Sequence, residues 1–161
     1  MVTPELVAAI EAVPDPELPV LSIADLGILR GIGVEDGRVV VTITPTYSGC
    51  PAMDAIRDDV LAACTAAGVP DAKVRTVLAP AWTTDWLTAE GARKLAEYGI
   101  APPGPRTGPV RLALSAGPGK VTCPQCGSPD TREASRFSST ACKALYTCRA
   151  CREPFEYLKA I

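Results

Sequence analysis

Two Cys-X-X-Cys pairs near the end of the chain constrain its folding more than any other feature. Cys123 and Cys126 form the first pair, Cys148 and Cys151 form the second, and 21 residues lie between them. Each pair makes a tight turn that directs two sulfurs at one ion, and two such turns complete a tetrahedral site for Zn²⁺. Iron also suits a tetrahedral four-sulfur site. The pattern therefore predicts a structural zinc site in residues 120–161, with iron as the alternative.

A bound metal matters for this segment because about 40 residues bury too little apolar surface to form a good core. A further cysteine, Cys142, lies six residues before Cys148 and outside both pairs. Its role stays open between a spare ligand, a buried small residue and a second reactive thiol. Residues 121–161 carry six Lys/Arg and four Asp/Glu, a net charge of +2. This weak basic character makes nucleic-acid binding a minor alternative.

Composition indicates the class of protein and the cell compartment in which it folds. The 161 residues suffice for one ordinary domain and a small one, and 47% hydrophobic with 21% charged residues is typical of globular proteins. The net charge of −2 argues against a general affinity for nucleic acid or anionic membranes. The N-terminus has neither a basic segment nor an apolar run, and no apolar stretch approaches the roughly 18 residues of a membrane helix. Seven cysteines without a secretion signal favour a reducing compartment, so we expect a cytoplasmic protein without membrane contact.

A single cysteine, Cys50, lies between a predicted strand and a predicted helix. Residues 39–44 alternate between apolar and other side chains, which predicts a strand, and residues 53–64 repeat apolar side chains at three and four, which predicts a helix. Gly49 permits a sharp turn, and Pro51 suits the first helical position, which leaves Cys50 extended at the helix cap. A thiol at a helix N-terminus is expected to favour the thiolate form.

Three roles remain for Cys50. The chain has no histidine, so no imidazole can activate the thiol and a Cys-His hydrolase is disfavoured. A thiolate that binds a metal or cluster, a thiol that exchanges with other thiols, and a small buried residue are the alternatives.

Two carboxylates precede this region. Asp15 and Glu17 lie in a proline-stiffened turn, with Pro14, Pro16 and Pro19 around them. They are either solvated turn residues or a fixed acidic pair near a site. We expect both near Cys50, where they could hold iron transiently but would also raise the pKa of the thiol.

The remaining pattern outlines the other elements. Thr3 and Pro4 begin a helix that ends near residue 13, and residues 28–34 and 39–44 form a hairpin around Asp36-Gly37. Residues 73–79 alternate as a third strand, and Thr88 caps a helix over 89–98. Cys64 falls on the apolar face of its helix and is expected in the core, and Trp82 and Trp86 are expected to pack in the core or at an interface.

Composition changes over residues 100–119, which hold five prolines and four glycines. This predicts a first domain over 1–99, a linker over 100–119 with a short strand over 110–114, and a second module over 120–161.

With these residues identified, the chain resembles a known family along nearly its whole length. Residues 14–80, with Asp15-Pro16-Glu17, the segment 22–27 and the stretch 44–52 around Cys50, resemble the MIP18-like domain of iron–sulfur cluster assembly factors. The segment 137–146, with its flanking Cys-X-X-Cys pairs, resembles the PaaD family, accessory subunits encoded with the phenylacetyl-CoA epoxidase. Ser138 departs from the family pattern, because relatives tend to have glycine there.

The resemblance implies an α/β (α+β) fold with helices packed on a small mixed sheet, followed by the zinc-ribbon-like four-cysteine module. It implies a maturation factor for a metal centre of the epoxidase, with no catalytic activity of its own. The cysteine that matches Cys50 is the suspected cluster or thiol site, and Asp15 and Glu17 match the acidic motif. The implied cargo is a transient iron or iron–sulfur cluster, and the implied partners are the diiron oxygenase and the iron–sulfur reductase subunits.

Two other functions stay open. The chain could be a structural subunit of the epoxidase complex without chemistry of its own, or a zinc ribbon that binds nucleic acid. The sequence determines neither the client subunit, nor the cluster type, nor whether the chain forms a homodimer.

Overall fold

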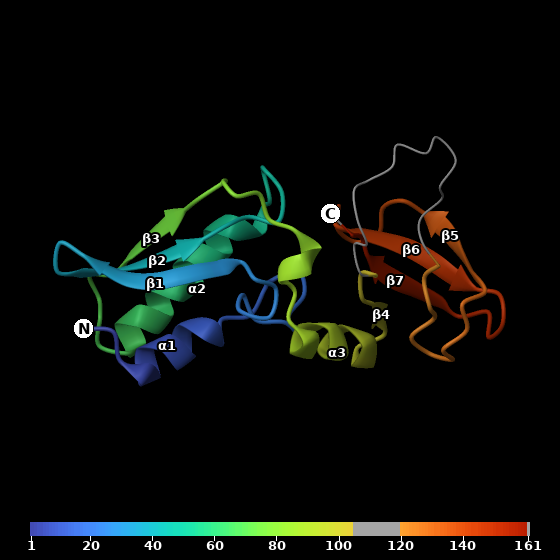
Figure 1. Ribbon diagram of the computed structural model, residues 1–161, viewed down its shortest axis with the longest axis horizontal. Coiled ribbons are helices and arrows are strands. Elements are labelled where there is room, and N and C mark those ends of the chain that lie inside the picture. Colours follow the sequence, from blue (N-terminus) through green and yellow to red (C-terminus); the bar gives the residue numbers. More distant parts are fainter. Residues whose placement is uncertain (105–119, 161) are drawn as a thin grey trace. The chain divides into compact units, whose positions relative to one another are not determined.

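The computed structural model describes residues 1–104 and 120–160 and divides into two compact units, Met1–Gly91 and Ala92–Ile161 (Figure 1). The short strand expected over residues 110–114, and most of the expected linker, lie outside the described residues. Among the helices that are described, none is long and apolar enough to cross a membrane.

The first unit contains a three-stranded mixed sheet with helices on one face. Its elements are α1 (Pro4–Glu11), β1 (Leu29–Glu35), β2 (Arg38–Ile43), α2 (Ala52–Ala66), β3 (Lys73–Thr76) and the 3₁₀ turn η1 (Thr84–Trp86). The helix α3 (Ala89–Glu97) begins at the end of this unit. The strand order is β1-β2-β3, with β1 antiparallel and β3 parallel to β2, which confirms the expected mixed sheet.

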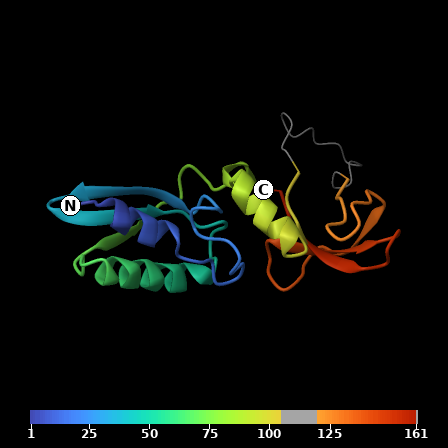
Figure 2. The same ribbon diagram turned by 90° about the horizontal axis from the view of Figure 1, so that it is seen from below.

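The helices α1 and α2 pack together on the same side of this sheet (Figures 1 and 2). The core between these layers is apolar because the residues on one face of β2 are buried and buried side chains recur at helical spacing in α1 and α2. Its members are Leu6, Ile10, Val39, Val41, Ile43, Ile56, Val60 and Cys64. Cys64 is fully buried, as the sequence pattern predicts.

Local sequence signals explain the ends of these elements. The Thr3 Oγ1 atom accepts a hydrogen bond from the Leu6 backbone N–H at 3.2 Å, which caps α1. Asp36 and Gly37 both have positive φ angles, 50° and 78°, as the expected two-residue hairpin turn requires. The Thr88 hydroxyl accepts a hydrogen bond from the Gly91 N–H at 2.9 Å, so it caps α3 as expected.

The segment from Ser22 to Gly27 anchors a later part of the chain. Ser22 and Asp25 each accept a hydrogen bond from the other's backbone N–H, at 3.1 and 3.0 Å. Trp82, which is buried, donates its indole N–H to the Leu26 carbonyl at 2.8 Å. Gly27 has a φ of +71° and lies against Trp86. This segment therefore holds the tryptophan-containing loop in place, which gives it a structural role.

The second unit contains a four-stranded sheet in the order β4-β7-β6-β5. The strands are β4 (Ile100–Ala101), β5 (Thr131–Ser135), β6 (Lys143–Cys148) and β7 (Pro154–Leu158). The strands β5, β6 and β7 pair antiparallel, and β4 pairs parallel to β7. The core of this sheet is small and includes Val121, Tyr146 and Phe155.

The strand β4 lies in the segment that composition assigns to the linker. Ile100 pairs with Glu156, Ala101 pairs with Tyr157, and both the isoleucine and the alanine are buried. The division between the compact units falls earlier, after Gly91. Composition does not reveal this strand, because its two apolar residues are followed directly by prolines and glycines.

Replacing Gly27 with alanine is expected to destabilise the first unit by about 2–4 kcal/mol. An added Cβ would lie 2.6 Å from the Trp86 Cβ and 2.7 Å from the Trp86 carbonyl oxygen, in a backbone conformation that alanine disfavours. Urea unfolding followed by tryptophan fluorescence measures this, because Trp82 and Trp86 are the two tryptophans of the chain and both belong to the first unit.

The matched control is Gly31→Ala in β1. No atom lies within 4 Å of the added Cβ at Gly31. We therefore expect a change within about 0.5 kcal/mol for this variant. Equal unfolding midpoints for the two variants would contradict the packing role assigned to Gly27.

Candidate functional site

The four paired cysteines of the second unit lie together in one cluster. The sulfurs of Cys123, Cys126, Cys148 and Cys151 all lie within 4.8 Å of one another. The Sγ–Sγ distance is 3.8 Å between Cys123 and Cys151 and 3.6 Å between Cys126 and Cys148. A tetrahedral ion with metal–sulfur distances of about 2.3 Å places its ligands about 3.8 Å apart, whereas a disulfide needs about 2.05 Å. The spacing of these sulfurs therefore fits a metal ion and does not fit disulfides.

Two turns build this cluster, as the spacing of the cysteines predicts. In the first turn the Gly127 N–H donates to the Cys123 carbonyl at 2.8 Å, and Gly127 has a φ of 72°. In the second turn the Cys151 N–H donates to the Cys148 sulfur at 3.5 Å, and it lowers the pKa of the Cys148 thiol to about 7. Backbone donors to sulfur stabilise the thiolate form that metal binding requires.

Cys142 lies at the other end of β6 from the cluster. Six residues of extended chain separate it from Cys148, which is roughly 20 Å. This separation excludes Cys142 as a spare ligand for the same ion. Its side chain is 8% exposed, and its sulfur lies 3.0 Å from the Thr140 hydroxyl oxygen. The roles of buried small residue and of second reactive thiol stay open for Cys142.

The loop that carries Cys142 is organised by the carboxylate of Glu156. Lys143, which is buried, donates to Glu156 at 2.8 Å, and the hydroxyls of Ser138 and Ser139 donate to the same carboxylate. Burial alone would raise the pKa of Glu156, but these hydrogen bonds outweigh it and lower the pKa to about 2. Ser138 thus supplies a side-chain hydrogen bond to this carboxylate.

Cys50 lies in the connection between β2 and α2. The helix begins at Ala52, and Pro51 occupies the cap position with helical backbone angles and no side-chain hydrogen bond. The prediction that Cys50 is the extended cap residue is therefore wrong by one position, because Pro51 is the cap residue. The Cys50 carbonyl accepts a hydrogen bond from the Met53 N–H at 3.3 Å, so Cys50 still directly precedes the first helical turn.

The helix end favours the Cys50 thiolate as expected, through the Ala52 N–H, but other contributions to the pKa outweigh it. Burial raises the pKa of the Cys50 thiol, and the charges of Glu17 and Asp15 raise it further. Hydrogen bonds from the Ala52 N–H and the Thr46 hydroxyl act in the opposite direction but do not compensate. The half-buried thiol is therefore protonated at neutral pH.

The acidic pair lies within electrostatic reach of Cys50, since both charges act on its thiol. Asp15 is only 6% exposed, and its Oδ1 atom accepts hydrogen bonds from the N–H groups of Glu17 and Leu18, at 2.9 and 2.8 Å. Asp15 is thus a buried carboxylate that shapes its own turn, and Glu17 is half-buried beside it. Whether the two carboxylates and the thiol share a bound ion remains a prediction.

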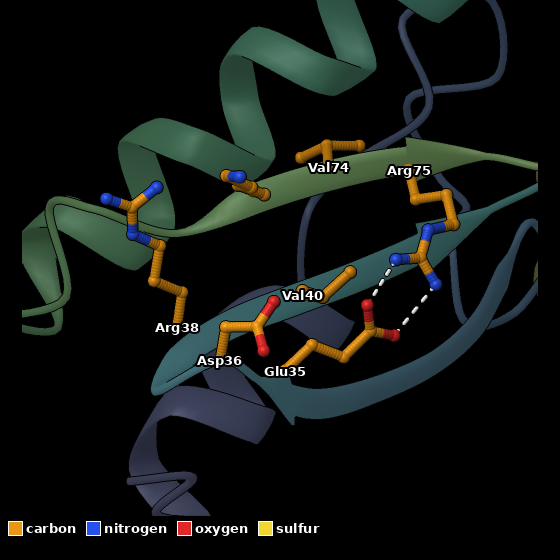
Figure 3. Close-up of a pocket in the computed structure, with 7 residues that line it drawn as sticks. Glu35, Asp36, Arg38, Val40, Val74 and Arg75 are labelled. Atoms are coloured by element: carbon orange, nitrogen blue, oxygen red, sulfur yellow. Dashed lines mark hydrogen bonds and ion pairs between the residues drawn. The ribbon is translucent and has the colours of Figure 1, made fainter.

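A hollow that sequence reasoning did not identify lies on the sheet of the first unit (Figure 3). Its volume is about 590 Å³, and Glu35, Asp36, Arg38, Val40, Lys73, Val74 and Arg75 line it. Arg75 donates to Glu35 at 2.8 Å across the surface, and both side chains are about half exposed. An exposed pair of this kind contributes little to stability. None of the predicted site residues lines this hollow, and we assign no chemistry to it.

Comparisons with known proteins match both units. A family model described as PaaD zinc beta ribbon domain matches residues 107–159, and one described as iron-sulfur cluster assembly protein matches residues 4–79. A protein from Escherichia coli (strain K12) is 45% identical to this chain over 157 residues. It is named as one of the subunits of 1,2-phenylacetyl-CoA epoxidase, and the match covers 98% of this chain and 92% of that protein.

Two further matches cover about half of this chain. A Porphyromonas gingivalis (strain ATCC BAA-308 / W83) protein named Fe-S protein maturation auxiliary factor is 36% identical over 56% of this chain and 88% of its own. The crystal structure of a domain of unknown function, DUF59, from Bacillus anthracis shares 30% identity and a TM-score of 0.51, covering 56% of this chain and 87% of that one.

Replacing Glu156 with glutamine is expected to destabilise the second unit by about 2–3 kcal/mol, because it leaves the buried Lys143 ammonium without its charged partner. Amide hydrogen exchange of residues 138–143 should accelerate, since the loop loses its charged acceptor. Removing the ammonium as well, in Glu156→Gln with Lys143→Met, should recover part of the loss.

The control for Glu156 is Glu153→Gln, an exposed carboxylate of the same unit. Thermal unfolding of this variant should match the parent chain. A double variant that is no more stable than Glu156→Gln alone would contradict the interpretation of a buried charge pair.

Proposed function

The chain belongs to the PaaD family, and on this premise we propose that it matures a metal centre of a phenylacetyl-CoA epoxidase through the thiol of Cys50. The observation that supports this proposal is that the negative charges of Asp15 and Glu17 both act on the Cys50 thiol, within the part of the chain that matches iron–sulfur cluster assembly proteins. The cargo is iron or an iron–sulfur cluster, and the client is an oxygenase or reductase subunit.

The environment of Cys50 suits a site that holds its cargo briefly. A thiol with a raised pKa is protonated at rest, so it is a weak ligand and resists oxidation. Binding of iron or a cluster must displace the thiol proton. The two nearby carboxylates attract the incoming cation, but they also raise the pKa of the thiol and so disfavour the thiolate. These opposing effects favour transfer over permanent binding.

A single thiol also limits what the first unit can hold. Iron–sulfur clusters are held in most proteins by four cysteine thiolates. Cys64, the other cysteine of this unit, is fully buried in the core and does not reach the surface near Cys50. Cys50 would therefore share its cargo with groups of the client, which again fits delivery.

The four-cysteine cluster has a different role in this proposal. The four sulfurs form a closed set with no open position, which is the arrangement of structural zinc sites. Residues Cys123, Cys126, Cys148 and Cys151 would hold zinc, which supplies folding free energy to a unit with a small core. Iron in the same site is the alternative.

A structural subunit of the epoxidase complex is the second candidate, since the Escherichia coli relative bears the name of a subunit. Co-purification separates the two functions. A stoichiometric complex with the oxygenase favours the structural role, and substoichiometric contact with a client that gains iron or acid-labile sulfide favours maturation. A nucleic-acid role has little support, because the chain has a net charge of −2.

The protein as isolated should contain about one zinc ion per chain, with sulfur atoms about 2.3 Å from the metal by X-ray absorption. A strong chelator should unfold the second unit and leave the tryptophan fluorescence of the first unit unchanged, because the metal site and the tryptophans lie in different units. Elemental analysis that finds neither zinc nor iron would contradict the assignment of a metal site to the four cysteines.

The Cys50→Ser variant should fold with a free energy of unfolding within about 1 kcal/mol of the parent chain. In cells that lack this protein, we expect it to restore epoxidase activity at least about 10-fold less well, because a hydroxyl cannot replace the thiolate. The direct measurement is the iron and acid-labile sulfide content of the epoxidase subunits purified from those cells.

Cys64→Ala is the matched control for Cys50→Ser. It should lower stability by about 1–2 kcal/mol through a small core cavity and still restore activity. If Cys50→Ser fully restores epoxidase activity and the client has its normal metal content, the structural role explains the protein better than maturation does.

A further inference from the structure

A hollow of about 460 Å³ lies beside the second cysteine turn of the second unit. Arg132, Thr147, Cys148, Arg149 and Arg152 line it. Three of these five side chains are permanently cationic, and no carboxylate is among them. We name this set the arginine hollow.

The backbone fixes the points from which the three arginines extend. Arg132 is paired with Thr147 across β5 and β6. The Arg149 N–H donates to the Asp130 carbonyl at 2.8 Å, and Arg152 has a φ of 67° in the turn after Cys151. Because these positions belong to a sheet and to the cysteine turn, the backbone fixes where the three cationic side chains begin.

A simpler explanation is that the arginines offset the charge of the metal site, since four thiolates around Zn²⁺ carry a net charge of −2. The Cys148 sulfur accepts hydrogen bonds from the backbone N–H groups of Cys151 and Ala150 and lies 3.6 Å from the Cys126 sulfur, and no arginine is among these described contacts. The Arg149 side chain instead lies 3.7 Å from Asp130, and both side chains are 61% exposed. Such an exposed pair is weak and exchanges readily for another carboxylate.

We propose that the arginine hollow docks an acidic segment, rich in aspartate or glutamate, on the epoxidase subunit that this chain serves. This inference rests on the proposed function, because it concerns the same client. Guanidinium groups bind carboxylates through two parallel hydrogen bonds, and a hollow of 460 Å³ has room for more than one carboxylate. Charge complementarity of this kind sets partner choice and accelerates association.

The test uses the full chain with Arg132, Arg149 and Arg152 all replaced by glutamine, and the purified epoxidase subunits of the same organism. We expect affinity for the client to fall at least about 10-fold, and its dependence on salt to become shallow. The control is Arg136→Gln, an exposed arginine of the same unit that does not line the hollow. Its affinity should stay within about two-fold of the parent.

Metal content separates a lost docking site from a lost fold. The glutamine variant should retain the metal of the parent chain, because its three substitutions leave the four clustered cysteines in place. Unchanged client affinity in the triple variant overturns the docking site alone, and so does a loss of metal without a loss of affinity. Salt-sensitive binding of a DNA duplex that the triple variant loses would reassign the hollow to nucleic acid. A parent chain that binds none of the epoxidase subunits overturns the proposed function as well.

Discussion

Four thiol sulfurs held at the spacing of a tetrahedron are the constraint on which the second unit depends. Two turns far apart in the chain must bring the sulfurs of Cys126 and Cys148 to 3.6 Å, and β5 and β6 keep the turns in register. The apolar core beside them is too small to enforce this approach by itself. An ion bound by all four thiolates would supply the missing free energy, so that the sheet and the metal site would stabilise each other.

The chain therefore contains thiols with opposite environments. In the cluster, the backbone N–H groups of Cys151 and Ala150 lower the pKa of the Cys148 thiol, whereas burial and the neighbouring sulfurs raise the pKa of the Cys151 thiol. At Cys50, burial and two carboxylates stabilise the protonated thiol. Cys64 and Cys142 are both buried, and in Cys64 burial also raises the thiol pKa. The neighbours of each sulfur thus account for the different environments of these cysteines.

Local sequence patterns predicted the parts of this structure that depend on neighbouring residues. The caps at Thr3 and Thr88, the Asp36-Gly37 turn and the two cysteine turns each involve a few consecutive residues, and each forms as expected. The mixed sheet and the α+β architecture came from the family resemblance. The features that were missed depend on residues distant in sequence. Burial, the largest cause of the raised pKa of Cys50, arises only in the folded unit, β4 exists only because it pairs with β7, and Glu156 accepts hydrogen bonds from residues 13 to 18 positions earlier.

Because β4 pairs with β7, the proline- and glycine-rich segment lies within the second unit and does not link the two units. Ile100 and Ala101 before it, and Val121 after it, are buried in the same unit. Both ends of the segment are therefore anchored in one body, so its length does not set the separation between the two units. A peptide inserted between residues 104 and 120 would therefore lengthen the chain within the second unit and leave the residues between Cys50 and β4 unchanged.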